Sequence, residues 1–292
     1  MNQGFIKVAA GTPGVTVADC RANTKAILEM IKEMEAQHAK IMVFPELCIT
    51  GYTCQDLFLQ RRLLDSAWES LLTLAEETRD VDALIFVGLP VRKNGKLYNA
   101  AAVLNHGNIL GFVPKTHIPN YNEFYEQRHF SSGEDVWDEI TIGEESVPFG
   151  SSLIFSCKEL PELTVGAELC EDLWVPLPPS VKLAMSGAHI IVNLSASDEM
   201  VGKDSYRREL VNSQSARLLC GYVYASAGSG ESTQDLVFGG HDIIAENGIV
   251  LAESKLYSTG LTVTEIDVQK LASERRRNTS FVGGLRPGMR RI

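Results

Sequence analysis

Short apolar runs alternate with amphipathic segments along most of the chain. Residues 5–11 (FIKVAAG) and 40–45 (KIMVFP) have the apolar content and length of buried strands. Between them, the apolar residues of 27–34 recur at the three- and four-residue spacing of one helix face, and residues 64–75 repeat that pattern. The first part of the sequence therefore predicts strand, helix, strand, helix.

Asparagine–glycine pairs mark two hairpins. The pair at 94–95 separates the strand patterns 83–91 and 97–106, and the pair at 247–248 lies inside DIIAENGIVLAES. Both residue types tolerate the positive φ that a tight hairpin turn requires. A further tight turn is expected at 105–108, before a strand in ILGFVPK.

The rest of the sequence mixes strands with two helices. After a loop-rich stretch that begins at about residue 116, strands are expected in SLIFS, LTVGAEL, AHIIVNLS, YVYASAG and GLTVTEID. Helical patterns lie around 177–186 and 204–220. Hairpins combined with strand–helix alternation predict one α/β domain in which helices cover a mixed sheet.

Composition restricts the partners. The 292 residues are 45% hydrophobic and 22% charged, and no apolar run approaches the roughly 20 residues that span a bilayer, so no membrane partner is expected. The first residues do not have the pattern of a signal peptide, which favours a cytoplasmic protein. A formal net charge of −10 argues against nucleic acid. The arginines at 275–277 are interpreted as a solvated tail or a contact with another domain.

Six cysteines are present, without a C-x-x-C pair or zinc-ligand spacing, so we expect reduced thiols and no metal site. Cys170 follows the strand pattern LTVGAEL, and the carboxyl end of a strand points into the crevice where α/β proteins bind ligands. Its acidic neighbours Glu168, Glu171 and Asp172 raise a thiol pKa, so a nucleophile here needs a nearby cation. Alone, the pattern is more typical of a buried structural cysteine.

Two other ionisable residues also follow an apolar strand that ends in proline. Glu46 lies in MVFPELC, where a buried carboxylate must be paired or take part in proton chemistry. Lys115 lies in GFVPKTH, and a lysine close to Cys170 would lower the thiol pKa and stabilise an oxyanion. His117 and His129 are alternative bases for a Cys–His pair, and their spacing does not rank them.

The motifs F-P-E, P-K-T-H and E-L-C-E-D, each at a strand end and in this order, resemble those of the carbon–nitrogen hydrolase (nitrilase) superfamily. The resemblance extends from residue 5 to about residue 270. It implies a four-layer αββα sandwich and a triad in which Glu46 is the general base, Lys115 stabilises the oxyanion and Cys170 is the nucleophile. The backbone N–H after Cys170 is a natural second oxyanion donor.

Four longer blocks, at 51–58, 119–130, 168–176 and 193–209, resemble one branch of that superfamily, the glutaminase domains of glutamine-dependent NAD synthetases. The resemblance implies hydrolysis of L-glutamine to glutamate and ammonia through a cysteine thioester. The ammonia would serve an absent or separate synthetase domain that converts deamido-NAD to NAD. A stand-alone amidase acting on another small amide and a non-catalytic assembly scaffold are the alternatives.

By position, five residues resemble that branch's substrate-side residues: Tyr121, Glu126, Glu171, Ser197 and Lys203. A glutamine site needs acids and a cation together, so Glu171 is expected to take the ammonium and Lys203 with Ser197 the carboxylate, while Tyr121 walls the pocket. Glu126 is expected either to hold Lys115 or to form a surface pair with Arg128.

Asn193 and Ser195 are expected to satisfy backbone groups at a strand end.

The domain is expected to cover residues 1–274, with 275–292 as a linker toward an absent ATP-dependent synthetase domain. ATP and Mg²⁺ are expected in that domain only, and no cofactor here. The string SAGSGES (226–232) lacks the order of a phosphate loop and is interpreted as a turn. Superfamily members associate through helical faces, so a homo-oligomer is expected.

Overall fold

The computed structural model describes residues 4–292, and its first sheet is built largely from the N-terminal half of the chain. Its eight strands lie in the order β14 (Gly260–Asp267), β1 (Phe5–Thr12), β2 (Ile41–Val43), β3 (Leu84–Lys93), β4 (Lys96–Asn105), β5 (Asn108–Pro114), β7 (Glu145–Gly150) and β6 (Trp137–Ile142). Strands β1, β2 and β3 are parallel, whereas β3, β4 and β5 form consecutive hairpins. The turn between β3 and β4 has φ of 49° at Asn94 and 73° at Gly95, as the sequence predicts.

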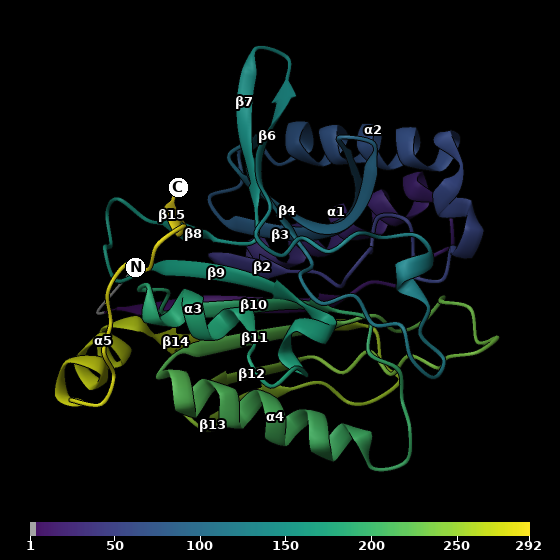
Figure 1. Ribbon diagram of the computed structural model, residues 1–292. Coiled ribbons are helices and arrows are strands. Elements are labelled where there is room, and N and C mark those ends of the chain that lie inside the picture. Colours follow the sequence, from purple (N-terminus) through teal and green to yellow (C-terminus); the bar gives the residue numbers. More distant parts are fainter. Residues whose placement is uncertain (1–3) are drawn as a thin grey trace.

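The second sheet is built from the C-terminal half. Its seven strands lie in the order β13 (Ile249–Glu253), β12 (Ile243–Glu246), β11 (Gly221–Ser226), β10 (Ile190–Ser195), β9 (Thr164–Leu169), β8 (Leu153–Ser156) and β15 (Arg290–Arg291). Strands β9, β10 and β11 are parallel and point the same way at its centre (Figure 1). The predicted hairpin at 247–248 joins β12 to β13.

Helices cover the outer faces of both sheets. Helices α1 (Cys20–Ala36) and α2 (Arg61–Glu77) lie on the first sheet, α3 (Pro179–Met185) and α4 (Lys203–Leu218) on the second, and α5 (Val268–Arg277) beside β1 (Figure 1). Three short 3-10 helices are η1 (Gln55–Leu59), η2 (Glu126–Arg128) and η3 (Cys170–Leu173). The chain therefore has the predicted four-layer αββα sandwich.

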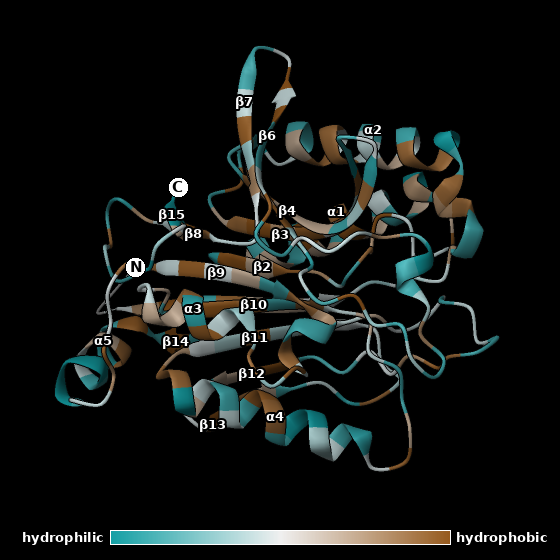
Figure 2. Ribbon diagram, viewed as in Figure 1, coloured by the Kyte–Doolittle hydropathy of each residue, from teal (hydrophilic) through white to brown (hydrophobic). Residues whose placement is uncertain are grey.

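Apolar side chains fill the three interfaces between the layers. Val8, Phe86, Val192 and Val223 belong to the core between the two sheets. Burying apolar surface is the main favourable term in folding, and the central strands β2, β3 and β4 are coloured largely as hydrophobic in Figure 2.

One segment differs from the predicted elements, and another adds contacts that the sequence does not indicate. The stretch predicted to be loop-rich contains the β6–β7 hairpin, which projects from the body (Figure 1); every residue of β6 is at least partly exposed, so it lacks an apolar run. At the other end, β15 pairs with β8, and the Arg275 guanidinium donates hydrogen bonds to the carbonyl oxygens of Ala188 (2.7 Å) and Leu219 (2.9 Å). Arg275 and β15 thus contact the domain, while most residues between them are exposed. The linker role of 275–292 stays a prediction.

No helix in the described part of the chain is long and apolar enough to cross a membrane.

Candidate active site

Three strands of the two sheets end at a common edge, where the predicted triad gathers. Glu46 follows β2, Lys115 follows β5 and Cys170 follows β9. Glu46 and Lys115 are 0% exposed and Cys170 is 6% exposed. The N–H of Glu46 donates to the carbonyl oxygen of Ser195 at the end of β10 (3.3 Å), which joins the two sheets at this edge.

Lys115 lies between two carboxylates. Its ammonium is 2.6 Å from Oε1 of Glu46 and 2.7 Å from Oε1 of Glu126. Burial opposes the charge of Lys115, but the two carboxylates outweigh burial and hold its pKa well above the ordinary value. Glu126 is therefore the carboxylate that holds Lys115, and Arg128 pairs with Asp56 instead (2.7 Å).

Neutral donors complete this cluster. The amide nitrogen of Asn99 on β4 donates to Oε1 of Glu46 (2.6 Å) and to Oε2 of Glu126 (3.3 Å). The Tyr52 hydroxyl donates to Oε1 of Glu126 (2.8 Å). These hydrogen bonds fix both carboxylates, which a buried charged group requires.

One carboxylate oxygen of this cluster accepts no hydrogen bond from the described residues. Oε2 of Glu46 is buried and has no hydrogen-bond partner among residues 4–292. Burial raises the pKa of Glu46 to about 7, with Glu126 adding to the effect and Lys115 opposing it. A carboxyl with this pKa and an unused oxygen is suited to take up and return a proton near neutral pH.

Cys170 occupies a sharp turn between β9 and η3. Its φ is 38°, in the left-handed region that non-glycine residues rarely adopt, and its N–H donates to Oδ1 of Asn193 (3.0 Å). Burial raises the pKa of the Cys170 thiol, the charge of Glu46 raises it further, and Lys115 opposes both. Lys115 is thus a cation that acts on the thiol, and burial together with Glu46 outweighs it.

Asp172 connects the Cys170 turn to the Lys115 strand end. Its carboxylate accepts hydrogen bonds from the N–H of Leu169 (3.1 Å) and from the N–H and Nδ1 of His117 (2.8 and 2.9 Å). The other candidate base, His129, lies 2.9 Å from Asp56. In residues 4–292 neither imidazole is hydrogen-bonded to the Cys170 thiol, so the geometry favours Glu46 as the base.

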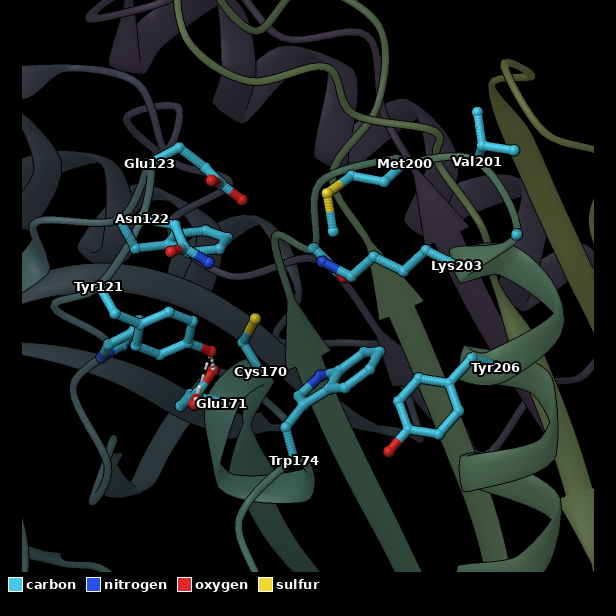
Figure 3. Close-up of a pocket in the computed structure, with 14 residues that line it drawn as sticks. Tyr121, Asn122, Glu123, Cys170, Glu171, Trp174, Met200, Val201, Lys203 and Tyr206 are labelled. Atoms are coloured by element: carbon cyan, nitrogen blue, oxygen red, sulfur yellow. Dashed lines mark hydrogen bonds between the residues drawn. The ribbon is translucent and has the colours of Figure 1, made fainter.

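The predicted substrate residues line one pocket beside the thiol. This pocket has a volume of about 380 Å³, and Ser197 lines it. Tyr121, Glu171 and Lys203 line it with Cys170 (Figure 3). The Tyr121 hydroxyl lies 3.0 Å from each carboxylate oxygen of Glu171.

The cationic residue of the pocket, Lys203, already has an anionic partner and two aromatic neighbours. Lys203 forms an ion pair with Asp198, and its ammonium lies 5.2 Å from the ring centroid of Trp174 and 5.8 Å from that of Phe124. The pocket thus offers an acid and a cation on opposite sides of the thiol (Figure 3).

The carbon–nitrogen hydrolase family model matches residues 7–276. The chain belongs to the carbon–nitrogen hydrolase family. It is 42% identical over 280 residues to the glutamine-dependent NAD(+) synthetase of Mycobacterium tuberculosis, and the match covers 95% of this chain and 41% of the relative. The glutamine-dependent NAD(+) synthetase of Aquifex aeolicus is 31% identical to this chain, and the match covers 89% of this chain and 42% of the relative. The chain thus spans about two fifths of the length of these relatives.

Solved structures agree with this family. A glutamine-dependent NAD(+) synthetase from Cytophaga hutchinsonii superposes with a TM-score of 0.81 at 29% identity, over 91% of this chain and 43% of that one. An amidase from Nesterenkonia has a TM-score of 0.71 at 19% identity, over 95% of this chain and 98% of that one. The second likeness concerns the fold of the carbon–nitrogen hydrolases alone.

Several residues of this carbon–nitrogen hydrolase site are absent from the predictions. Three of them lie in strands with mostly apolar sequences: Asn99, Tyr222 and Tyr224. A buried polar residue inside an apolar run is the signal that could have identified these three. The fourth, Tyr52, lies in a loop. Asn193 satisfies a backbone group, as expected, and that group is the N–H of Cys170 itself.

The Ser195 side chain instead pairs with the Tyr224 hydroxyl (2.6 Å). The string SAGSGES contains a turn at 229–230, as expected, and its Glu231 accepts hydrogen bonds from the N–H groups of Tyr52 (2.6 Å) and Thr53 (3.0 Å). That segment therefore supports the loop that carries Tyr52. Among residues 4–292, no group of three or more His, Cys, Asp or Glu side chains is arranged to hold a metal ion.

Proposed function

We propose that this domain hydrolyses L-glutamine to glutamate and ammonia, and that a synthetase domain uses the ammonia to convert deamido-NAD to NAD. The observation that carries the proposal is the buried Glu46–Lys115 pair beside Cys170, at a pocket with an acid and a cation. The similarity to glutamine-dependent NAD(+) synthetases supports glutamine as the amide.

The first half of the reaction forms a thioester. Glu46 removes the thiol proton of Cys170, and the thiolate attacks the amide carbon of glutamine. Lys115 and the N–H of Glu171, which follows Cys170 at the start of η3, stabilise the oxyanion. The tetrahedral intermediate collapses as Glu46 returns the proton to the nitrogen, so ammonia leaves and the acyl–sulfur bond remains.

The second half consumes water. Glu46 takes a proton from a water molecule, whose oxygen attacks the thioester carbon. The same donors hold the second oxyanion. The carbon–sulfur bond then breaks, the sulfur regains a proton from Glu46, and glutamate leaves with the site restored.

The pocket residues select the substrate's charged end. Glu171 accepts the α-ammonium, with Tyr121 holding its carboxylate in place, and Lys203 with Ser197 takes the α-carboxylate. Binding at Lys203 competes with its ion pair to Asp198. Amides without these α-groups should therefore be poorer substrates.

The remaining expectations belong with this proposal. ATP and Mg²⁺ would act in the synthetase domain, and no cofactor would act in this one. A cytoplasmic location and a homo-oligomer remain predictions from the sequence and the family.

The test is ammonia release from glutamine and from a panel of other small amides, with Cys170→Ala in parallel. We expect glutamine to be preferred and the mutant to lose activity, because no thioester forms. Cys157→Ala changes a thiol outside the pocket and is the matched control. Preference for another amide would favour a stand-alone amidase. No release from any amide, with no labelling of Cys170 by an electrophilic glutamine analogue, would favour a scaffold.

A further inference from the structure

A buried arginine lies behind the substrate pocket. Arg207 is on α4, one helical turn after Lys203, so the two side chains lie on the same face of that helix. Lys203 lines the pocket beside Cys170 (Figure 3), whereas the Arg207 side chain is 0% exposed. The proposed reaction does not use this second cation, although burying a charge is costly.

The Arg207 guanidinium binds three consecutive residues that precede α4. Its Nη2 donates to Oγ of Ser197 (3.3 Å) and to the carbonyl oxygen of Asp198 (3.0 Å). Its Nη1 donates to Oε1 of Glu199 (2.5 Å) and lies 3.0 Å from Nδ1 of His241. One side chain thus holds the whole segment 197–199.

This segment also places the polar groups of the pocket. Ser197 lines the pocket, and the Asp198 carboxylate forms the ion pair with Lys203. The backbone is held as well, because the N–H of Glu199 donates to the carbonyl oxygen of Val237 (2.7 Å). The position of residues 197–199 therefore decides where the two groups that are to bind the substrate carboxylate lie.

The direction of these hydrogen bonds suits an anionic ligand. A guanidinium only donates, so Oγ of Ser197 accepts from Arg207 and keeps its own proton for another acceptor. A carboxylate is a strong acceptor for such a proton. Arg207 binds Asp198 through the carbonyl oxygen and leaves the carboxylate to Lys203.

The ion pair with Glu199 does not by itself explain an arginine at this position. Nε of Arg207 is buried and has no hydrogen-bond partner among residues 4–292. An unpaired buried donor costs free energy, and a lysine could pair with Glu199 without it. The planar guanidinium, however, reaches Glu199 from one nitrogen and the backbone of Asp198 from another, which a single ammonium cannot do.

We propose that Arg207 is a positioning residue that sets the affinity of the pocket for the α-carboxylate of the substrate. It acts through Ser197 and Asp198 and does not itself bind the substrate, because its side chain is fully buried. The inference rests on the proposed function in taking glutamine as the substrate. Arg207 thus governs KM for glutamine and leaves the reactivity of Cys170 unchanged.

The test replaces Arg207 by lysine, which keeps a positive charge beside Glu199 and removes the two-nitrogen fork. KM for glutamine should rise by about tenfold while kcat falls less than about twofold, because hydrogen bonds that orient the carboxylate site are lost and the triad is untouched. Alkylation of Cys170 by iodoacetamide, which has no α-groups, should keep the wild-type rate. Ammonia release and mass spectrometry of the peptide that contains Cys170 measure these values.

Arg275→Lys is the matched control. Arg275 also donates to backbone carbonyl oxygens, those of Ala188 (2.7 Å) and Leu219 (2.9 Å), but it does not line the pocket of Cys170. Its replacement should lower the free energy of unfolding, as that of Arg207 should, and leave KM for glutamine unchanged. Urea unfolding compares the stability of the two variants.

A second variant serves if Arg207→Lys does not fold. Glu199→Gln keeps the shape of the side chain and removes only the charge that Nη1 of Arg207 binds. It should raise KM for glutamine in the same direction by a smaller factor, about threefold, because the guanidinium is held less firmly.

An unchanged KM in the folded variant would overturn the inference and leave the proposed function in place. An equal rise of KM in Arg275→Lys would also overturn it, as would a loss of Cys170 alkylation in Arg207→Lys, since either result would mean a general disturbance of the fold. A wild-type protein that releases no ammonia from glutamine would refute the proposed function and this inference together.

Discussion

The two sheets contribute differently to the same site. The first sheet and the loop after β5 supply charges: the Lys115 ammonium lies 2.6 Å from Glu46 and 2.7 Å from Glu126 of η2. The second supplies the thiol and a set of hydroxyl and amide groups. Charged groups tune proton transfer through their mutual pKa shifts, whereas neutral hydrogen bonds hold a geometry at every pH. The difference suggests that one sheet controls protonation and the other controls the position of the nucleophile.

The largest effect should come from the charged half. Lys115→Met removes the cation between Glu46 and Glu126 and leaves two carboxylates buried, which costs about 3–5 kcal/mol of folding stability. Ammonia release should fall by at least about 10³-fold, because the oxyanion also loses a donor. Urea unfolding and steady-state kinetics measure the two losses.

The matched control is an exposed pair. Lys40 lies 2.5 Å from Asp82, and Lys40→Met should cost less than about 1 kcal/mol with no loss of activity. Equal losses in both variants would mean that burial of the Lys115 cluster does not matter.

The next effect tests position without removing any functional group. Gly88 on β3 lies under the Glu46 turn, where a Cβ would be 2.3 Å from the nitrogen of Leu47 and 2.6 Å from the oxygen of Pro45. Gly88→Ala must therefore displace the backbone that carries Glu46, and kcat should fall by about 10²-fold. Gly14→Ala, where a Cβ meets nothing within 4 Å, should keep wild-type kcat. A wild-type rate in Gly88→Ala would show that the base tolerates displacement.

A smaller effect is expected where the two halves are joined. Asp172→Asn replaces an acceptor of the Leu169 and His117 N–H groups by an amide that accepts through one oxygen only. We expect a loss of about 2 kcal/mol in stability and about tenfold in kcat, with KM changed less. Retention of both values would mean that the Cys170 turn is held by Asn193 alone.

Asp172 also shows which features of the site can be predicted from the sequence and which cannot. Apolar periodicity and the Asn-Gly turns predict most elements, because local pattern and burial agree there. The order of the three strand-end motifs, through its resemblance to the carbon–nitrogen hydrolases, singles out Glu46, Lys115 and Cys170. The bridge from Asp172 to His117 joins residues 55 apart in sequence, and the pairing of Ser195 with Tyr224 depends on strand register. Neither spacing nor composition contains that information.

The β6–β7 hairpin escapes prediction for a different reason. No residue of β6 is buried and only the end of β7 is, so the hairpin leaves no long apolar run in the sequence. Hydrophobic patterns predict the strands and helices that bury apolar side chains in the core, and they do not indicate exposed strands.

The smallest effect concerns a carboxyl of the second sheet that has no cation beside it. Glu168 accepts hydrogen bonds from the Tyr222 hydroxyl (2.5 Å) and the N–H of Ser180 (2.7 Å), and burial raises its pKa to about 7. Between the ordinary glutamate pKa and about 7, the folded state binds more protons than the unfolded state, so stability falls as pH rises. Glu168→Gln should remove roughly 1–2 kcal/mol of that decline.

Urea unfolding at pH 5 and pH 7.5 measures the change. The unfolding free energy of Glu168→Gln should fall less between these two values than that of the wild type, while the decline due to Glu46 remains. Glu265→Gln alters an exposed carboxylate paired with Lys7 at 3.9 Å and should keep the wild-type decline. An unaltered decline in Glu168→Gln would mean that Glu168 ionises in the folded protein as it does in water, and the second sheet would then be a charged half like the first.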